Sequence, residues 1–425
     1  MRLNHLHKHI CNICFILFPF VLLNAQNQID SIPSVQPETD LIDVMRKLFK
    51  ATPDTVIRSS KPSISILPVV GYNPSFGGLI GFNSVMGKQY GEPSNTDYSV
   101  FNLLFSYSSS KVITLQSRHN VFRPGNIWNF QGNWQLSFYG LVDHGLGTGN
   151  TDFCYVENDE NDIPLHKNDS IFPIRYNYLR LSEKIYYEFL KNFYIGAGIN
   201  LNFYGDIDDL NLSDTLSTPH FRYSTLNQFN PKHYRVNGLQ LAFQYNTRDH
   251  TVRSYTGMYF DFDLQLNTKW LGSTQSSATV SYDFRKYFSL SKRNPTHVLA
   301  FWHWATYEIS GTRPYLNLPY TGSDTYNRSG RGYTIGYFRG PSYAYFETEY
   351  RYPILGNNLI SGVVFMNFQT AGNDDGTSVY QAWNIGGGAG LRILFQKRSR
   401  SALCIDFARG NCGSKGIFFG LNEVF

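Results

Sequence analysis

From Ser63 to the end of the chain, apolar and polar residues alternate along a series of segments. In the clearest segment, 128–138, apolar residues alternate with polar ones. The apolar residues are Trp128, Phe130, Trp134, Leu136 and Phe138, and the polar ones are Asn129, Gln131, Asn133, Gln135 and Ser137. Successive side chains of a β-strand point to opposite faces, so one face of this strand is aromatic and the other is polar. Runs of about nine or more alternating residues fit a tilted membrane strand better than a strand of a soluble sandwich.

The pattern predicts about sixteen strands, the size of a large membrane barrel. Their expected spans are 63–72, 77–88, 98–109, 111–121, 126–139, 174–189, 193–204, 235–248, 257–268, 277–289, 296–309, 342–353, 358–371, 384–396, 401–409 and 416–425. An even number lets the first and last strands pair antiparallel, and the sheet must close because lipid cannot satisfy an open edge. The predicted fold is therefore all-β: a transmembrane antiparallel β-barrel over residues 63–425, preceded by a short periplasmic helix.

The composition agrees with a sheet that has one apolar face and one polar face. The chain contains 33 Phe, 30 Tyr and 6 Trp, and 16% of its residues are charged, against roughly 25% in ordinary soluble domains. Its mean hydropathy of −0.30 is too polar for a bundle of membrane helices. The net charge is only +5, and no run of Lys and Arg supports a nucleic-acid partner.

The first 25 residues have the pattern of a signal peptide. Arg2 and Lys8 precede a mostly apolar core from Ile10 to Leu23, and cleavage after Ala25 fits the sequence. The apolar run is too short for a comfortable membrane helix. We therefore expect residues 1–25 to direct export. The absence of Cys at the cleavage point argues against a lipoprotein anchor.

Residues 26–62 form a polar leader with one amphipathic segment. Apolar residues recur at helical spacing between Asp40 and Ala51. This segment is expected to form either a periplasmic helix or a plug that enters the barrel.

The predicted connections differ in length on the two sides of the sheet. The long ones, 140–173, 205–234, 310–341 and 372–383, all fall on one side. Short periplasmic turns and long outer loops are typical of outer-membrane barrels. This asymmetry places both chain ends in the periplasm.

The long segment 310–341 contains Arg331, Gly332 and Tyr333. It is either an exposed, mobile loop or a loop folded against the barrel wall. A buried Arg would need a carboxylate partner. Glu347 and Glu349 share one strand face and are the leading candidates, and Asp406 and Asp283 are others.

The last predicted strand, 416–425, ends in Phe. The alternation places Ile417, Phe419, Leu421 and Phe425 on one face. Phe419, Leu421 and Phe425 match the pattern of a sorting signal that assembly machinery reads by strand addition. The alternative is an ordinary last strand.

Several weak motifs occur in a shared order along the chain. They are YNTRD at Tyr245–Asp249, RGY at Arg331–Tyr333, GAGLR at Gly388–Arg392, LCIDFA at Leu403–Ala408 and NEVF at Asn422–Phe425. This order resembles the BamA/TamA superfamily of outer-membrane barrels, the bacterial surface antigen group. The resemblance implies sixteen strands and a sixth outer loop, anchored inside the barrel by Arg331, Gly332 and Tyr333 together with Glu347 and Glu349.

Three departures from the family pattern are evident. Gly330 replaces the usual aliphatic residue before the Arg, and Asn367 stands where the family usually has Asp. The leader 26–62 is too short for the family's periplasmic repeat modules, so a barrel-only member is expected.

No set of residues points to catalysis, a cofactor or a metal. His303 lies between two Trp residues without a convincing Ser or carboxylate partner. Acidic residues in the long loop could hold Ca²⁺, but a solvated acidic loop is the commoner explanation. They are Glu157, Asp159, Glu160 and Asp162. Cys154 and Cys412 either pair or, with Cys404, remain free thiols.

The sequence therefore favours a bacterial outer-membrane protein that is not an enzyme. The resemblance implies a noncovalent assembly or translocation factor, in which the seam between the first and last strands opens and a client strand adds there. The alternatives are a passive or selective pore and an accessory barrel that binds partner proteins. Expected partners are outer-membrane lipids, client barrel or secreted proteins, and periplasmic or lipoprotein partners, with no nucleic acid.

Overall fold

The computed structural model describes most of the chain after residue 36. The described residues are 37–49, 62–73, 77–92, 94–148, 157–158, 164–165, 172–374, 376–397, 399–411 and 413–425. The chain divides into two units, Met1–Ser34 and Val35–Phe425, and only the second is described. The predicted signal peptide, Cys154, Cys412 and most of the acidic loop segment lie outside the described residues.

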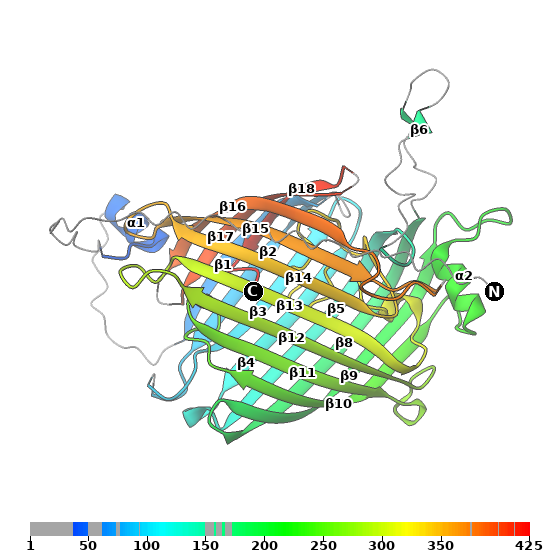
Figure 1. Ribbon diagram of the computed structural model, residues 1–425, viewed down its shortest axis with the longest axis horizontal. Helices are drawn as coiled ribbons and strands as arrows, with labels where there is room; N and C mark the ends of the chain where they lie inside the picture. Colours follow the sequence, from blue (N-terminus) through cyan, green and yellow to red (C-terminus); the bar gives the residue numbers. More distant parts are fainter. Residues whose placement is uncertain are drawn as a thin grey trace, which may run out of the picture. The chain divides into compact units, whose positions relative to one another are not determined.

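Sixteen strands form one antiparallel sheet in chain order (Figure 1). They are β1 (Ser63–Asn73), β2 (Gly77–Lys88), β3 (Ser99–Ser108), β4 (Ile113–Phe122), β5 (Trp128–Asp143), β8 (Phe172–Leu190), β9 (Phe193–Asp209), β10 (Tyr234–Asn246), β11 (Gly257–Asn267), β12 (Ser277–Ser289), β13 (Val298–Gly311), β14 (Tyr343–Pro353), β15 (Ile360–Ala371), β16 (Asn384–Gln396), β17 (Ser401–Gly410) and β18 (Lys415–Leu421). The predicted all-β fold and strand number are confirmed. A separate small hairpin pairs two strands of two residues each, β6 (Glu157–Asn158) and β7 (Pro164–Leu165).

The alternating pattern separates the two faces of the wall as the sequence predicts. On β5, the side chains of Trp134, Leu136 and Phe138 are exposed on the outside, whereas Gln135 and Ser137 are buried inside. The outer face is therefore suited to lipid, and the polar face lines the interior.

The sheet returns to its first strand, because β18 contacts β1. Each other pair of neighbours in the described sheet has a hydrogen-bonded register, for example Ser63↔Gly87 between β1 and β2. Within the described residues, no such register joins β1 to β18. This junction, called the seam below, is therefore held by fewer backbone hydrogen bonds than the rest of the wall.

The two ends of the barrel differ in the length of their connections. One end, called the loop end, carries the long segments 144–171, 210–233, 312–342 and 372–383, and the other, called the turn end, has connections as short as 191–192. Counted along the chain, 312–342 is the sixth connection at the loop end, as the sequence predicts. Within the fourth such connection lies the helix α2 (Pro219–Leu226).

The helix α1 (Leu41–Leu48) lies at the turn end (Figure 1). Asp40 caps it, accepting a hydrogen bond of 2.7 Å from the Asp43 backbone N–H. The Asp40 carboxylate also accepts from the Lys397 backbone N–H at 2.9 Å, and Lys397 Nζ lies 2.6 Å from Asp43. These bonds fix α1 beside the turn after β16 with none of its residues buried, so the plug interpretation of this segment is wrong.

No helix among the described residues is long and apolar enough to cross a membrane.

Candidate functional site: a loop anchored inside the barrel

The sixth connection at the loop end, residues 312–342, folds back into the barrel. The rings of Tyr315 and Tyr333 are buried, as are the guanidinium groups of Arg331 and Arg339. Tyr315 donates a hydrogen bond of 2.7 Å to Asp143, at the end of β5. On the opposite side of the loop, Thr321 donates to the Gln369 side chain of β15 at 2.8 Å. The loop is therefore held from both sides and is not an exposed segment.

Arg331 lies at the centre of these contacts and is 2% exposed. Its Nη1 lies 2.8 Å from Asp406, and its Nη2 lies 2.5 Å from Glu347 and also bonds Glu349. The guanidinium carbon lies 3.4 Å from the centre of the Phe365 ring. A buried guanidinium is stable only when its charge and donors are matched, and here three carboxylates match them.

The residues around Arg331 leave room for the tip of the loop. Gly332 has φ = +104°, a conformation that favours glycine, and an added Cβ would lie 2.8 Å from the Arg409 backbone. Gly410 faces the Tyr333 ring, and a Cβ there would lie 2.4 Å from a ring carbon. A larger residue at either glycine would push the loop away from the wall.

Tyr333 and the backbone of Arg331 complete the attachment. Tyr333 donates a hydrogen bond of 2.6 Å to the Ile385 carbonyl and accepts one of 2.8 Å from the Asn411 N–H. Burial raises the pKa of Tyr333 to about 12, so its hydroxyl remains a donor. Asn367, on β15, donates to the Arg331 carbonyl at 2.9 Å.

The Arg331 contacts belong to a larger balanced set, called the lumenal charge cluster below. It consists of four arginines and four acids: Arg253, Arg331, Arg351, Arg392, Glu347, Glu349, Asp406 and Glu423. Each is at most 4% exposed. Because arginines and acidic side chains are equal in number, the loss of one member leaves the buried cluster with an unbalanced charge.

Glu423 connects the cluster to the C-terminal residues. Its carboxylate lies 2.7 Å from Arg392 Nε and 3.0 Å from Arg253 Nε. Burial alone would raise the pKa of Glu423, but Arg392, Arg351 and Arg253 outweigh burial and hold it well below its usual range. Glu423 therefore stays charged at neutral pH.

The last residues do not continue the final strand. β18 ends at Leu421, Asn422 has φ = +72°, and the chain turns inward. Phe425 stacks on Trp302 with ring centres 5.2 Å apart, and its main-chain oxygen accepts from Arg351 at 2.8 Å. The expectation that Phe425 shares a strand face with Ile417 and Phe419 is wrong, because the ion pairs of Glu423 and the ring contacts of Phe425 draw the end of the chain into the barrel.

The other members of that predicted face differ in exposure. Phe419 is 55% exposed on the outside, whereas Leu421 is buried. Ile417, Phe419 and Leu421 alternate along β18 with Phe418 and Gly420. The role of Phe419, Leu421 and Phe425 as a sorting signal stays a prediction.

Among the predicted anchoring residues, the structure brings together Arg331, Glu347, Glu349 and Asp406. Asp283 is elsewhere, 2.5 Å from Arg285. Sequence reasoning missed Arg253, Arg351, Arg392 and Glu423. Arg351 has the same parity as Glu347 and Glu349 on β14, so its inward direction was readable from the alternation. Arg253 lies in a turn, where no periodic signal exists.

The remaining sequence candidates have simpler surroundings. His303 faces the Tyr282 ring, with 5.2 Å between ring centres, on the face opposite to Trp302 and Trp304. Cys404 is buried and unpaired. The described residues contain no group of three or more His, Cys, Asp or Glu side chains arranged to hold a metal.

Comparison with known proteins agrees with this architecture. The family description "Omp85 superfamily domain" matches residues 167–397, whereas no curated protein sequence matches the chain. The structure of BamA from Haemophilus ducreyi lacking POTRA domains 1–3 is 14% identical with a TM-score of 0.51, over 86% of this chain and 70% of that chain. CdiB from Escherichia coli is 8% identical with a TM-score of 0.54, over 84% of this chain and 62% of that one.

A third structure, CdiB from Acinetobacter baumannii, is 13% identical over 85% of this chain and 65% of that chain, with a TM-score of 0.46. This chain thus spans less than two thirds of the length of either CdiB. The family match covers more than half of the chain and confirms the predicted resemblance. The chain belongs to the Omp85 superfamily of bacterial outer-membrane β-barrels.

Proposed function

We propose that this barrel assembles or translocates other proteins at the outer membrane, without covalent chemistry. The seam between β1 and β18 carries the proposal. A strand edge with unpaired N–H and C=O groups is a template for another strand. At a weak seam, a client strand can pair with β1 or β18 at a smaller cost than anywhere else in the wall.

In this proposal, the sixth loop keeps the interior closed while the seam works. Arg331, Gly332 and Tyr333 anchor the tip, and Glu347 and Glu349 hold Arg331. The anchored loop occupies space that an open barrel of sixteen strands would leave to water. We assign the turn end, and with it α1, to the periplasm.

Membership in the Omp85 superfamily supports an assembly or translocation role in general. The clients, and any periplasmic or lipoprotein partners, belong to the proposal. A passive or selective pore is the competing function, and it requires a loop that leaves the lumen readily.

A seam-locking experiment tests the proposal. The full chain, with its native cysteines replaced by Ser, is reconstituted into liposomes. Folding of a urea-unfolded outer-membrane barrel is then followed by its heat-modifiable migration on gels. Pairs of cysteines scanned across β1 and β18 lock the seam when oxidised. The matched control is Leu241→Cys with Leu264→Cys, which face each other across the paired strands β10 and β11.

We expect the unlocked barrel to accelerate client folding. Oxidation should abolish the acceleration only in the seam variants, and a reductant should restore it. Equal activity of the locked seam and the locked control would refute the role of the seam. A reconstituted barrel that does not accelerate folding would refute the assembly function for that client.

A further inference from the structure

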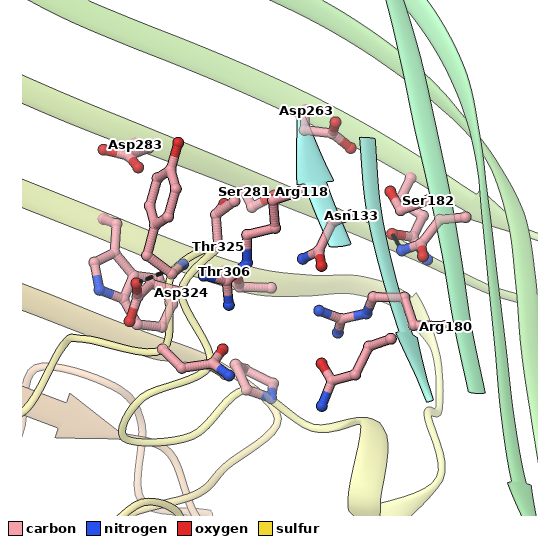
Figure 2. Close-up of a pocket in the computed structure, with 18 of the residues that line it drawn as sticks. Arg118, Asn133, Arg180, Ser182, Asp263, Ser281, Asp283, Thr306, Asp324 and Thr325 are labelled. Carbon is pink, nitrogen blue, oxygen red and sulfur yellow. Dashed lines mark hydrogen bonds between the residues drawn. The ribbon is translucent and has the colours of Figure 1, made fainter. Parts of the chain in front are cut away.

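A polar cavity of about 340 Å³ lies inside the barrel, between the wall and the sixth loop. Side chains of β4, β5, β8, β11 and β12 line one side, and residues 316–320 and 323–327 of the loop line the other. Figure 2 shows Arg118 and Arg180 reaching into the cavity from the strands, with Asp324 and Thr325 on the loop. This cavity is separate from the lumenal charge cluster, because none of the cluster residues lines it.

Three of the cations in the lining are neutralised by a nearby carboxylate. The pairs are Lys184 with Asp261 at 3.0 Å and Asp263 at 3.2 Å, Arg285 with Asp283 at 2.5 Å, and Arg313 with Glu308 at 3.3 Å. Arg248, at the turn end of the cavity, lies over the Tyr259 ring and donates to Asn246. Within the described residues, Arg248 forms no ion pair and keeps its positive charge, whereas Asp261 and Asp263 together exceed the charge of Lys184 by one carboxylate.

Arg118 and Arg180 are different, because within the described residues neither forms an ion pair. Arg118 donates a hydrogen bond of 2.7 Å to Gln116, and Arg180 donates one of 3.2 Å to Asn202. Arg118 Nε is buried without any hydrogen-bond partner. The two guanidinium groups are close enough to repel each other. Their other charge contacts are with tyrosine rings, Arg118 over Tyr326 at 5.3 Å and Arg180 over Tyr178 at 5.6 Å. A pair of like charges without an ion-pair partner, one of them with an unmatched donor, is costly.

The carboxylate that faces them from the loop is already engaged. Asp324 accepts hydrogen bonds from three backbone N–H groups of its own loop: Tyr326 at 3.0 Å, Arg328 at 2.9 Å and Ser329 at 2.7 Å. Asp324 thus shapes the loop and offsets only part of the charge of the two arginines. Arg328, which also repels Arg118, donates instead to the carbonyls of residues 421–423.

We propose that this cavity is a binding site for a small soluble anion that carries a phosphate, sulfate or carboxylate group. Arg118 and Arg180 would hold its oxygens, since guanidinium groups match the geometry of such oxyanions. The amide of Asn133, which faces the same space in Figure 2, adds a neutral polar contact. The barrel wall separates the cavity from lipid, so the ligand comes from the aqueous phase. This site does not depend on the proposed assembly function.

Titration calorimetry of the purified full chain in detergent micelles, with inorganic phosphate at constant ionic strength, tests the proposal. Sulfate serves as a second probe. The variants are Arg118→Gln and Arg180→Gln, and the matched control is Arg222→Gln, which removes the same charge from an exposed position of helix α2. Heat-modifiable migration on gels reports whether each variant is folded. Arg180→Lys retains the charge and serves if a Gln variant does not fold.

We expect saturable phosphate binding to the unchanged chain and to Arg222→Gln. Each cavity variant should bind at least about tenfold more weakly, the effect of losing one charge-assisted hydrogen bond. Arg180→Lys should bind more tightly than Arg180→Gln. An unchanged chain that binds neither phosphate nor sulfate would overturn the proposal, and so would equal affinities of the cavity variants and the control.

Discussion

Replacing Arg331 with Gln removes the charge that three buried carboxylates share while keeping a side chain of similar length. The lumenal charge cluster would then hold four acids against three arginines. Breaking a buried ion pair by removing one partner costs about 3–5 kcal/mol. Because the released loop exposes these acids to water, the same free energy favours release. At 1.36 kcal/mol per tenfold change, the released population should rise by roughly 150- to 5,000-fold.

Thiol labelling measures this population. Ser329 lies two residues from Arg331 and is 6% exposed, so Ser329→Cys in a background without native cysteines should react slowly with a maleimide. Where opening is fast relative to labelling, the rate follows the open fraction. We expect Arg331→Gln to raise the labelling rate by about two orders of magnitude or more, and Arg222→Gln on α2 to leave it unchanged. A rise below about tenfold would show that the buried charge of Arg331 does not hold the loop in place.

A charge-balanced double variant checks the cause. Glu347 has Arg331 as its only ion-pair partner within the described residues, whereas Glu349 also pairs with Arg351 and Asp406 with Arg392. Arg331→Gln combined with Glu347→Gln restores equal numbers of acids and arginines. If unbalanced charge drives the release, the double variant should label more slowly than Arg331→Gln alone. Equal rates would point instead to lost packing around Arg331.

Three further predictions concern the seat of the loop and the end of the chain. Gly410→Ala places a Cβ 2.4 Å from the Tyr333 ring, so it should raise thiol labelling at position 329, whereas Gly420→Ala, with open space around its Cβ, should not; equal labelling would contradict this. Phe425→Ala removes the stack on Trp302 and should destabilise the docked C-terminus by about 3–5 kcal/mol. Carboxypeptidase should then trim the C-terminus faster, as measured by mass spectrometry. Unchanged trimming would contradict the docked end. The pKa of Glu423 lies below its ordinary value of 4.5, so the stability that its ion pairs give to the docked C-terminus is complete above that pH and is lost as the pH falls further. Trimming by an acid-stable carboxypeptidase should therefore accelerate below about pH 4.5. Glu423→Gln should remove most of this pH dependence.

The strands of the barrel wall were predictable from the sequence because apolar and polar residues alternate along them. Strand boundaries such as 77–88, 277–289 and 384–396 agree with the alternating pattern at both ends. The pattern failed at the last strand, where apolar residues at the correct spacing continue to Phe425 but the chain leaves the sheet after Leu421. Alternation records which face a side chain would occupy, and it contains no information about ion pairs that draw a segment inward.

The site was predictable in part, for a related reason. Arg331 and its partners on β14 follow from a buried charge that needs carboxylates on an inward strand face. Which of several inward acids lies within reach depends on how far the loop descends, and this is set by contacts such as Tyr333 with Gly410. Arg253 joins the site from a turn between β10 and β11. The sequence does not predict this ion pair, because its two residues are far apart along the chain and meet only in the closed barrel.

Single-channel conductance in planar bilayers is the most direct test of a closed barrel held shut by its sixth loop. The chain and Arg331→Gln would be compared under the same voltage and salt, with Arg222→Gln as the control for charge. We expect the unchanged barrel to be nearly closed and Arg331→Gln to show frequent large openings. A wide, steady pore in the unchanged barrel that Arg331→Gln does not alter would contradict the anchored loop and favour a channel.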